Sequence, residues 1–333
     1  MCHNLRLSAR AELDVTDPID ACLHTLRGRF RRQRPLRSGS LLMTILGDAI
    51  APRGGRVTLG SLIRLAEPLG LPERLVRTSV ARLAQDGWLA ARRSGRTSEY
   101  QLTERGRRRF AAATRRIYRA RPRTWNRRWT LIMLAPLAVA AGQRRERLRE
   151  ELHWLGFGQF APDVFGHPSF GSAQVHARLA EAGIENHVTL LEAQSEHPRD
   201  DRRLVRSGWD LAELARAYRR FVAGFAPLRA ALRTGGVPTP KVAFVARTLL
   251  IHEYRRIHLR DPALPDVLLP QDWVGTAAYE LCRELYRALF RAAERHLTLQ
   301  ARRLAGVLPA ASREARGRFA RHGSARIRSD SRG

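Results

Sequence analysis

The stretch LGLPERLVRTSVARLAQDG, residues 69–87, decides the fold of the N-terminal part of this chain. Gly70 allows the positive φ with which a helix ends, and Pro72 suits the first turn of the next helix. At 100° per residue, the helix predicted over Pro72–Asp86 has one largely apolar side, formed by Val76, Ser79, Val80 and Leu83, and one polar side. The polar side carries Arg74, Arg77, Thr78, Ala81 and Gln85, with Arg82 at its margin.

The flanking sequence supplies the other elements of a winged helix-turn-helix. A helix from Ser40 to the Ala51-Pro52 stop, a short strand over 57–59 and a helix over Ser61–Pro68 come before the stretch. Two strands, 88–92 and 98–102, follow it around a Ser-Gly turn, and a basic helix then extends from Thr103 to about Arg121. We therefore expect a DNA-binding domain over residues 36–123.

The residue types on the polar side suit the edges of DNA bases. Arginine makes bidentate contacts to guanine and glutamine to adenine, while threonine contacts a phosphate or a thymine methyl group. Basic residues of the strand pair would face phosphate or the minor groove. Outside such a domain, a basic face on a surface helix is more often exposed to solvent without binding DNA. The predicted DNA-binding residues are Arg74, Arg77, Thr78, Arg82, Gln85, Arg92, Arg93 and Arg96.

The charge is concentrated in the same part of the chain. The formal net charge of the 333 residues is +29, and residues 1–128 hold 28 arginines against 10 acidic residues. Lys241 is the single lysine, which is typical of a GC-rich coding sequence, but that bias does not explain the excess of basic over acidic residues. Such an excess favours nucleic acid as a partner. We expect a flexible basic arm over residues 1–35 and a disordered basic tail over 309–333.

Several functional classes are disfavoured. The three cysteines lie far apart and have no neighbours at metal-ligand spacing, so neither a structural metal nor a disulfide framework is expected. The longest apolar run, Trp129–Ala141, is too short to cross a bilayer, and no signal peptide is visible, so we expect a cytoplasmic protein without membrane contact. No nucleophile-elbow, Walker or dinucleotide-binding motif occurs, so no catalytic residue or cofactor is assigned.

The rest of the chain divides into two further parts. Residues 124–204 alternate strands at 129–134, 156–160 and 187–191 with helices at 143–155 and 172–182, which predicts a ferredoxin-like α+β sandwich. Residues 205–308 carry helical periodicity over 210–232, 242–259 and 276–304. The predicted architecture is therefore α+β and multidomain, with an N-terminal winged helix-turn-helix, a central sandwich and an all-helical C-terminal domain.

Seven separate segments carry a family resemblance: 76–83, 86–89, 127–131, 154–158, 252–256, 261–265 and 268–275. In their sequence and order these segments resemble the phenylacetate-degradation repressor family, PaaX. That resemblance implies a dimeric transcriptional repressor, which binds an operator in double-stranded DNA and is released by phenylacetyl-CoA bound outside the DNA-binding domain. A regulator of another operon with a different thioester or free acid as effector is the alternative.

An acyl-CoA effector requires basic groups for its phosphates and an apolar slot for its acyl group. Trp129 and Trp154 are also typical core residues, and His252 is equally suited to an interdomain hydrogen bond. The candidate effector-binding residues are Arg128, Trp129, Trp154, His252, Tyr254, Arg255 and Arg256.

Two other functions compete with a repressor. The central part resembles in topology the small metal-dependent nucleases of CRISPR adaptation, which need a carboxylate at the end of the first strand. Here that strand ends Met133-Leu-Ala-Pro-Leu without an acid, which disfavours nuclease chemistry. A non-specific nucleic-acid-binding protein would instead use arm, tail and hairpin only for phosphate contacts.

Overall fold

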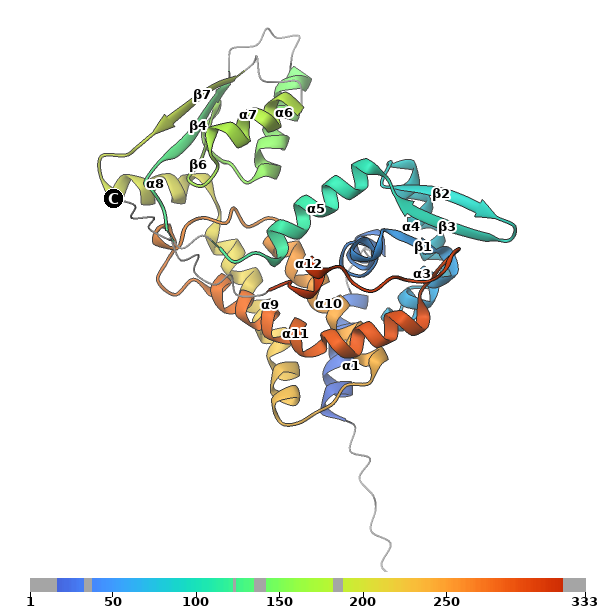
Figure 1. Ribbon diagram of the computed structural model, residues 1–333. Coiled ribbons are helices and arrows are strands. Elements are labelled where there is room, and N and C mark those ends of the chain that lie inside the picture. Colours follow the sequence, from blue (N-terminus) through green and yellow to red (C-terminus); the bar gives the residue numbers. More distant parts are fainter. Residues whose placement is uncertain (1–16, 33–37, 122–123, 135–141, 182–187, 320–333) are drawn as a thin grey trace, which may run out of the picture.

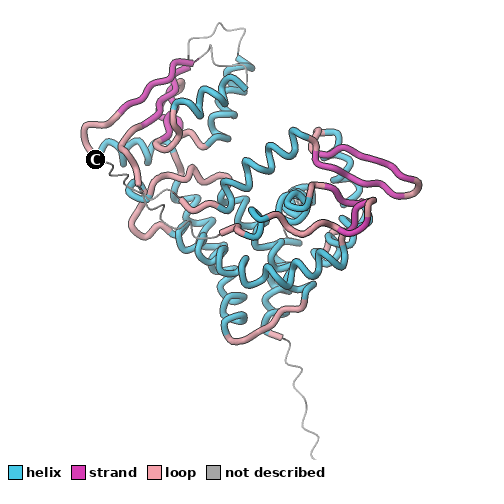
Figure 2. Tube along the Cα trace, in the orientation of Figure 1, coloured by secondary structure: helices cyan, strands magenta, loops and turns pink. Residues whose placement is uncertain are grey.

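The computed structural model describes residues 17–32, 38–121, 124–134, 142–181 and 188–319. A central four-stranded sheet with its own helices stands apart from a larger, mainly helical body (Figure 1). Helices dominate that body, and a small N-terminal sheet lies at one edge of it (Figure 2). No described helix combines the length and apolar character needed to cross a bilayer.

The N-terminal part follows the predicted order of elements closely. A π-helical turn, Leu46–Ile50, and a 3-10 turn, Ala51–Arg53, extend the first predicted helix, and Gly70 ends the second with a φ of 83°. The strands form an antiparallel sheet in the order β1-β3-β2. The elements are α2 (Ser38–Ile45), β1 (Arg56–Thr58), α3 (Leu59–Ala66), α4 (Glu73–Gln85), β2 (Leu89–Ser94), β3 (Thr97–Leu102) and α5 (Glu104–Tyr118).

The central part has one more strand than the sequence predicted. The extended run after Gly156 turns back at Pro162-Asp163, so that β5 and β6 form a hairpin. The antiparallel order β5-β6-β4-β7, with a helix after β4 and another after β6, is that of a ferredoxin-like sandwich. The elements are β4 (Trp129–Leu134), α6 (Gly142–Leu155), β5 (Gly158–Ala161), β6 (Val164–His167), α7 (Ser172–Glu181), β7 (Val188–Ala193) and α8 (Pro198–Gly208).

Two apolar clusters hold the central sheet. Ile132 and Phe165 are fully buried against Leu148 and Leu152 of α6, and this cluster also includes residues of α7. A second cluster joins Trp129 to α8 and to the segment that includes Leu264 and Leu268. That segment follows the second of the long C-terminal helices, so the second cluster connects the central sheet to the helical part.

The C-terminal part is helical, as predicted, and shares one continuous apolar core with the N-terminal part. Thr239 caps its second long helix by accepting a hydrogen bond from the backbone N–H of Val242. A two-residue strand pair follows the third long helix and contacts β1. The elements are α9 (Leu211–Arg233), α10 (Pro240–His258), α11 (Val274–Gln300), β8 (Arg302–Arg303), β9 (Gly306–Val307) and α12 (Arg313–Arg316).

The expectation of a flexible arm before residue 36 was wrong for its described residues. Asp17 caps a helix, α1 (Pro18–Arg31), and this helix packs against α9 and α10. Its four buried residues recur every three or four positions, which places them on one face of a helix. They are Ile19, Leu23, Leu26 and Phe30.

The expectation of a disordered tail was also wrong for residues 309–319. Ser312 caps α12 and donates its backbone N–H to the carbonyl oxygen of Pro52 at 3.0 Å. Phe319 is 1% exposed, and the Arg318 guanidinium lies 4.3 Å from the ring centre of Tyr118. The remainder of the predicted tail, 320–333, lies outside the described residues, as do 1–16 of the predicted arm.

A buried carboxylate joins the N-terminal, helical and tail segments. Asp48 is 6% exposed and pairs with Arg247 of α10 at 3.1 Å and with Arg318 at 2.8 Å. The hydroxyl groups of Tyr118 and Tyr286 donate to the same carboxylate at 2.6 and 2.9 Å. Burial alone would raise the pKa of Asp48, but the two guanidinium groups and the two hydroxyls lower it below its ordinary value. Asp48 is therefore charged and fully compensated.

Two buried histidines are held in the neutral form. His167 accepts the backbone N–H of Ser169 at Nδ1 (3.0 Å) and lies 2.9 Å from the carbonyl oxygen of Pro262 through Nε2, which therefore carries the proton. Burial lowers the pKa of His167 to about 4. Burial also lowers the pKa of His258 to about 4, against the opposing effect of Asp261. Protonation of either ring would place a charge on a buried group.

Replacing Asp48 by Asn should lower the free energy of unfolding by roughly 3–5 kcal/mol, because Arg318 would remain buried without a countercharge and Arg247 would keep only Glu294. Urea titration measures this. Glu73→Gln, which removes an ion pair whose side chains are more than half exposed, is the matched control and should cost less than about 1 kcal/mol. Equal, small losses in both variants would show that the buried network does not stabilise the fold.

Stability should also decrease as the pH falls from 6.5 to 4. In this window the unfolded histidines take up protons while the folded ones, with pKa values of about 4, do not. The linkage amounts to about 1.4 kcal/mol per pH unit for each histidine. His167→Gln should lower the slope of unfolding free energy against pH by about 1.4 kcal/mol per pH unit, and an unchanged slope would refute this origin.

Candidate nucleic-acid interface

Helix α4 buries its apolar side and leaves its polar side exposed. Val76 and Val80 are fully buried and Leu83 is 7% exposed, where α4 packs against α2 and α3. Ser79 is half-buried and its hydroxyl lies 3.0 Å from that of Ser38 on α2. The exposed residues are Arg74, Arg77, Thr78, Ala81, Arg82 and Gln85, the set that the sequence placed on this side.

Two of the three arginines on this exposed side have no compensating carboxylate among the described residues. Arg77 pairs with Glu73 one turn earlier at 2.6 Å, an exposed ion pair that costs little to exchange for another anion. Thr78 donates its hydroxyl to the carbonyl oxygen of Arg74 at 2.9 Å, so its methyl group and oxygen lone pairs remain available. Among the described residues, Arg74 and Arg82 have no ion-pair partner.

The β2–β3 hairpin presents a second basic surface. Ser94 pairs with Thr97 across a two-residue turn in which Gly95 has a φ of 55°. Arg92, Arg93 and Arg96 are all exposed. Glu99 lies opposite Arg92 in the ladder, but its carboxylate is 4% exposed and accepts the backbone N–H of Leu304 at 2.7 Å. The acid is therefore directed into the protein, and the exposed side of the hairpin keeps its charge.

Helix α5 begins directly after the hairpin and extends the basic surface. Thr103 caps it by accepting the backbone N–H of Gly106 at 3.0 Å. Trp88, at the base of the hairpin, packs edge-on against Phe110 of α5, with the Arg109 guanidinium 5.2 Å from the centre of its ring. This half-buried tryptophan is a packing residue. The exposed arginines of α5's first half are Arg105, Arg107, Arg108 and Arg109.

The structure does not bring the predicted effector-binding residues together. Arg128 pairs with Glu192 at an exposed edge of the central sheet. Trp129 is 1% exposed, donates Nε1–H to Asp201 at 2.8 Å and packs among other aromatic rings. Trp154 lies on α6, and its side chain is outside the described set. The other four candidates lie on α10.

Three of the candidates on α10 hold the helix against its neighbours. His252 is fully buried, with Nδ1 3.1 Å from the Thr44 hydroxyl on α2. Arg255 donates from Nε to the same hydroxyl at 2.7 Å and from Nη2 to the Ser40 hydroxyl at 2.8 Å. The hydroxyl of Tyr254, also fully buried, lies 3.2 Å from Nδ1 of His258. His252 and Arg255 connect the helical part to α2, the helix on which α4 rests, while the ring of Tyr254 packs on Phe221 of α9.

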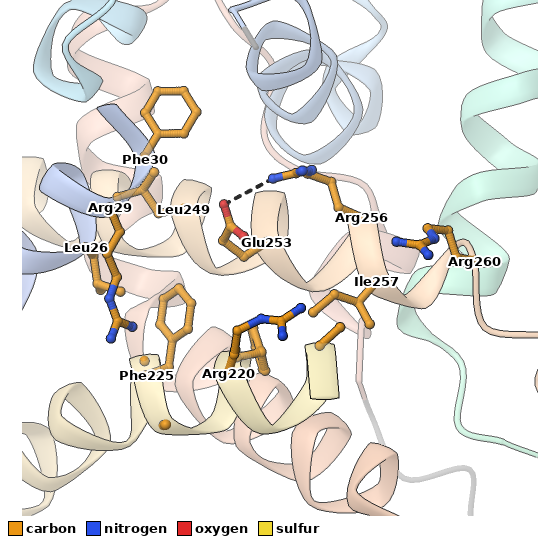
Figure 3. Close-up of a pocket in the computed structure, with 14 residues that line it drawn as sticks. Leu26, Arg29, Phe30, Arg220, Phe225, Leu249, Glu253, Arg256, Ile257 and Arg260 are labelled. Carbon is orange, nitrogen blue, oxygen red and sulfur yellow. Dashed lines mark ion pairs between the residues drawn. The ribbon is translucent and has the colours of Figure 1, made fainter. Parts of the chain in front are cut away.

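Arg256 is the candidate that lines a pocket. This pocket, of about 540 Å³, lies between α1, α9 and α10 (Figure 3). No sequence pattern indicates its other arginines, Arg29, Arg220 and Arg260, because α1 falls in the segment expected to be a flexible arm and lies far from α9 and α10 in sequence. No group of three or more potential metal ligands occurs among the described residues.

Three family models match the chain. The model for PaaX-like protein matches residues 37–106, that for the PaaX protein central Cas2-like domain matches 122–205, and that for the PaaX-like protein C-terminal domain matches 209–299. Transcriptional repressor PaaX of Escherichia coli (strain K12) is 37% identical over 280 residues, covering 83% of this chain and 88% of that protein. Among solved structures, uncharacterized protein Rv0674 from Mycobacterium tuberculosis is 24% identical with a TM-score of 0.48, covering 71% of this chain and 89% of that one.

Proposed function

The chain belongs to the PaaX family, and from that premise we propose that it is a transcriptional repressor that binds an operator in double-stranded DNA. The observation that carries this proposal is the outward side of α4, on which arginine, threonine and glutamine are exposed together. These residue types recognise base edges in the major groove. The name of the E. coli relative supports repression as the outcome of binding.

In this proposal residues 36–123 act as a winged helix-turn-helix. The turn at Gly70 sets α4 against α3, and α4 enters the major groove while the β2–β3 hairpin acts as the wing. Arg74, Arg77, Thr78, Arg82 and Gln85 contact base edges or adjacent phosphates. Arg92, Arg93 and Arg96 of the wing contact the backbone or the minor groove.

The repressor binds as a homodimer and responds to an acyl-CoA. Two copies of α4 reach half-sites separated by one helical turn of DNA or a multiple of it. An aryl acyl-CoA thioester, phenylacetyl-CoA by family resemblance, binds better to a geometry that no longer matches these half-sites, and so releases the DNA. The gene product would then control phenylacetate or related aromatic-acid catabolism. Its central part, residues 122–205, which matches the model for the Cas2-like domain, would have no catalytic role.

Gel shifts with the DNA upstream of the gene and with scrambled DNA test the repressor proposal. A repressor should prefer its operator by about 10³-fold or more at physiological salt. Phenylacetyl-CoA should then weaken operator binding. Equal affinity for both DNAs would leave only a non-specific binder, whereas a preference insensitive to the thioester would point to a different effector.

Two single substitutions separate base reading from backbone contact. Arg77→Ala should cost about 1–3 kcal/mol and relax specificity at one base position, whereas Arg96→Ala should weaken binding to all sequences alike and reduce the salt slope by about 1. Competition against a library of single-base operator variants, repeated at several salt concentrations, measures both effects. Arg233→Ala, at the end of α9 and outside the DNA-binding region, is the control and should change neither. A uniform loss for Arg77→Ala would make that residue a backbone contact.

A further inference from the structure

We propose that the pocket between α1, α9 and α10 is the effector site and that its ligand is an amphipathic polyanion, an organic phosphate that carries an apolar acyl or aryl group. This inference rests on the proposed ligand-released repressor and assigns a place to its ligand. The pocket's volume of about 540 Å³ is in the range of small-molecule sites. This assignment excludes the candidates in the central part of the chain, Arg128, Trp129 and Trp154, and places the ligand in one cavity formed by three helices.

The wall of the pocket is apolar and aromatic. Phe30 of α1 and Phe221 and Phe225 of α9 are 1%, 4% and 2% exposed, and Leu249 and Ile257 of α10 complete the wall. Phe225 extends from α9 toward α10 in Figure 3. Aromatic rings at fixed positions favour a flat acyl or aryl group through area burial and edge or stacked ring contacts. The apolar end of the ligand therefore belongs here.

Arginines surround that wall. Four arginines and one glutamate line the pocket, a formal charge of +3. Arg256 pairs with Glu253 at 3.6 Å, and Arg260 pairs with Glu213 at 2.6 Å. Arg29 and Arg220 have no carboxylate within ion-pair distance in the part of the chain that the structure describes. With Glu213 counted, the four arginines exceed the carboxylates by two. One guanidinium group binds two phosphate oxygens at once, so this excess suits a ligand with several phosphate charges better than a single carboxylate.

The backbone around Arg29 is adapted to its guanidinium. A Cβ at Gly224 would lie 2.5 Å from Nη1 of Arg29, so the absence of a side chain at this position of α9 gives the guanidinium its space. Gly224 lines the pocket, as does Arg29.

A short chain of contacts connects the pocket to α4. The ring of Phe30 lies edge-on to His252, with 5.4 Å between ring centres. His252 contacts Thr44 of α2, and α2 packs on α4, with 3.0 Å between the hydroxyls of Ser38 and Ser79. Helix α10 lines the pocket with Glu253 and Arg256 and holds α2 with His252 and Arg255. A ligand that separates α1 from α10 would therefore move the support of α4.

Isothermal titration calorimetry without DNA tests the site, with phenylacetyl-CoA, coenzyme A and phenylacetate as separate probes. Phenylacetyl-CoA should bind most tightly, coenzyme A less tightly and phenylacetate least. Arg220→Ala should weaken phenylacetyl-CoA and coenzyme A by about tenfold or more while phenylacetate changes little. Ala217→Phe, which fills the pocket without changing its charge, should weaken phenylacetyl-CoA more than coenzyme A. Ala217 lines the pocket.

Arg219→Ala is the matched control, because Arg219 is the exposed neighbour of Arg220 on α9 but lines a different hollow with Gln271 and Asp272. Operator binding by all three variants checks that they are folded. If wild type binds the thioester and Arg220→Ala and Ala217→Phe bind it equally well, the pocket is not the site, although the repressor proposal stands. If wild type binds none of the three probes, the effector proposal and this site both fail.

Thr44→Val tests the contact chain separately, because Thr44 lies outside the pocket and its hydroxyl contacts both His252 and Arg255. The variant should bind phenylacetyl-CoA with unchanged affinity but require more of it to release the operator. If the variant releases the operator at the same phenylacetyl-CoA concentration as wild type, these contacts do not transmit the signal. A loss of stability alone would lower the melting temperature but would not leave ligand affinity unchanged while raising the concentration needed for release.

Discussion

The charge on Asp48 is the constraint on which the arrangement of this protein depends. A buried carboxylate is tolerated when opposite charges and hydrogen-bond donors surround it, and here those groups come from α5, α10, α11 and the segment after α12. Each partner therefore fixes the position of its own segment relative to the π-helical turn that carries Asp48. The elements proposed to bind DNA are consequently parts of the same core as the long C-terminal helices, with which they share buried contacts from α2 and α5.

This shared core bears on how a ligand could act. A DNA-binding unit on a flexible linker would be insensitive to events in the helical part. Here α10 carries three kinds of contact: Arg247 to Asp48, His252 and Arg255 to α2, and Arg256 to the pocket. Packed helices shift between discrete arrangements more readily than they deform, so a small movement of α10 can reach α4 through α2. Coupling of this kind requires only that the ligand prefer one arrangement.

The sequence predicted α4 to within one residue at each end, because Gly70, Pro72 and Gly87 are strong local signals and the apolar spacing is regular. It failed where structure depends on distant partners. The apolar residues of α1 lie within a basic segment, and the face that covers them belongs to α9 and α10, some 200 residues later. Four-residue strands such as β6 are too short for a clear period of two. The tail residues Arg318 and Phe319 fit a site built from three other segments.

Photo-crosslinking from α4 tests the central claim most directly. A photoreactive amino acid at Ala81, an exposed position between Arg77 and Gln85, should crosslink to bases of the operator, and phenylacetyl-CoA should abolish the crosslink. The same group at Arg219 on α9 should give no crosslink with or without the thioester. Two results would contradict the account. One is a crosslink from position 219 but not from position 81. The other is a crosslink at position 81 that saturating thioester leaves unchanged while the operator is released.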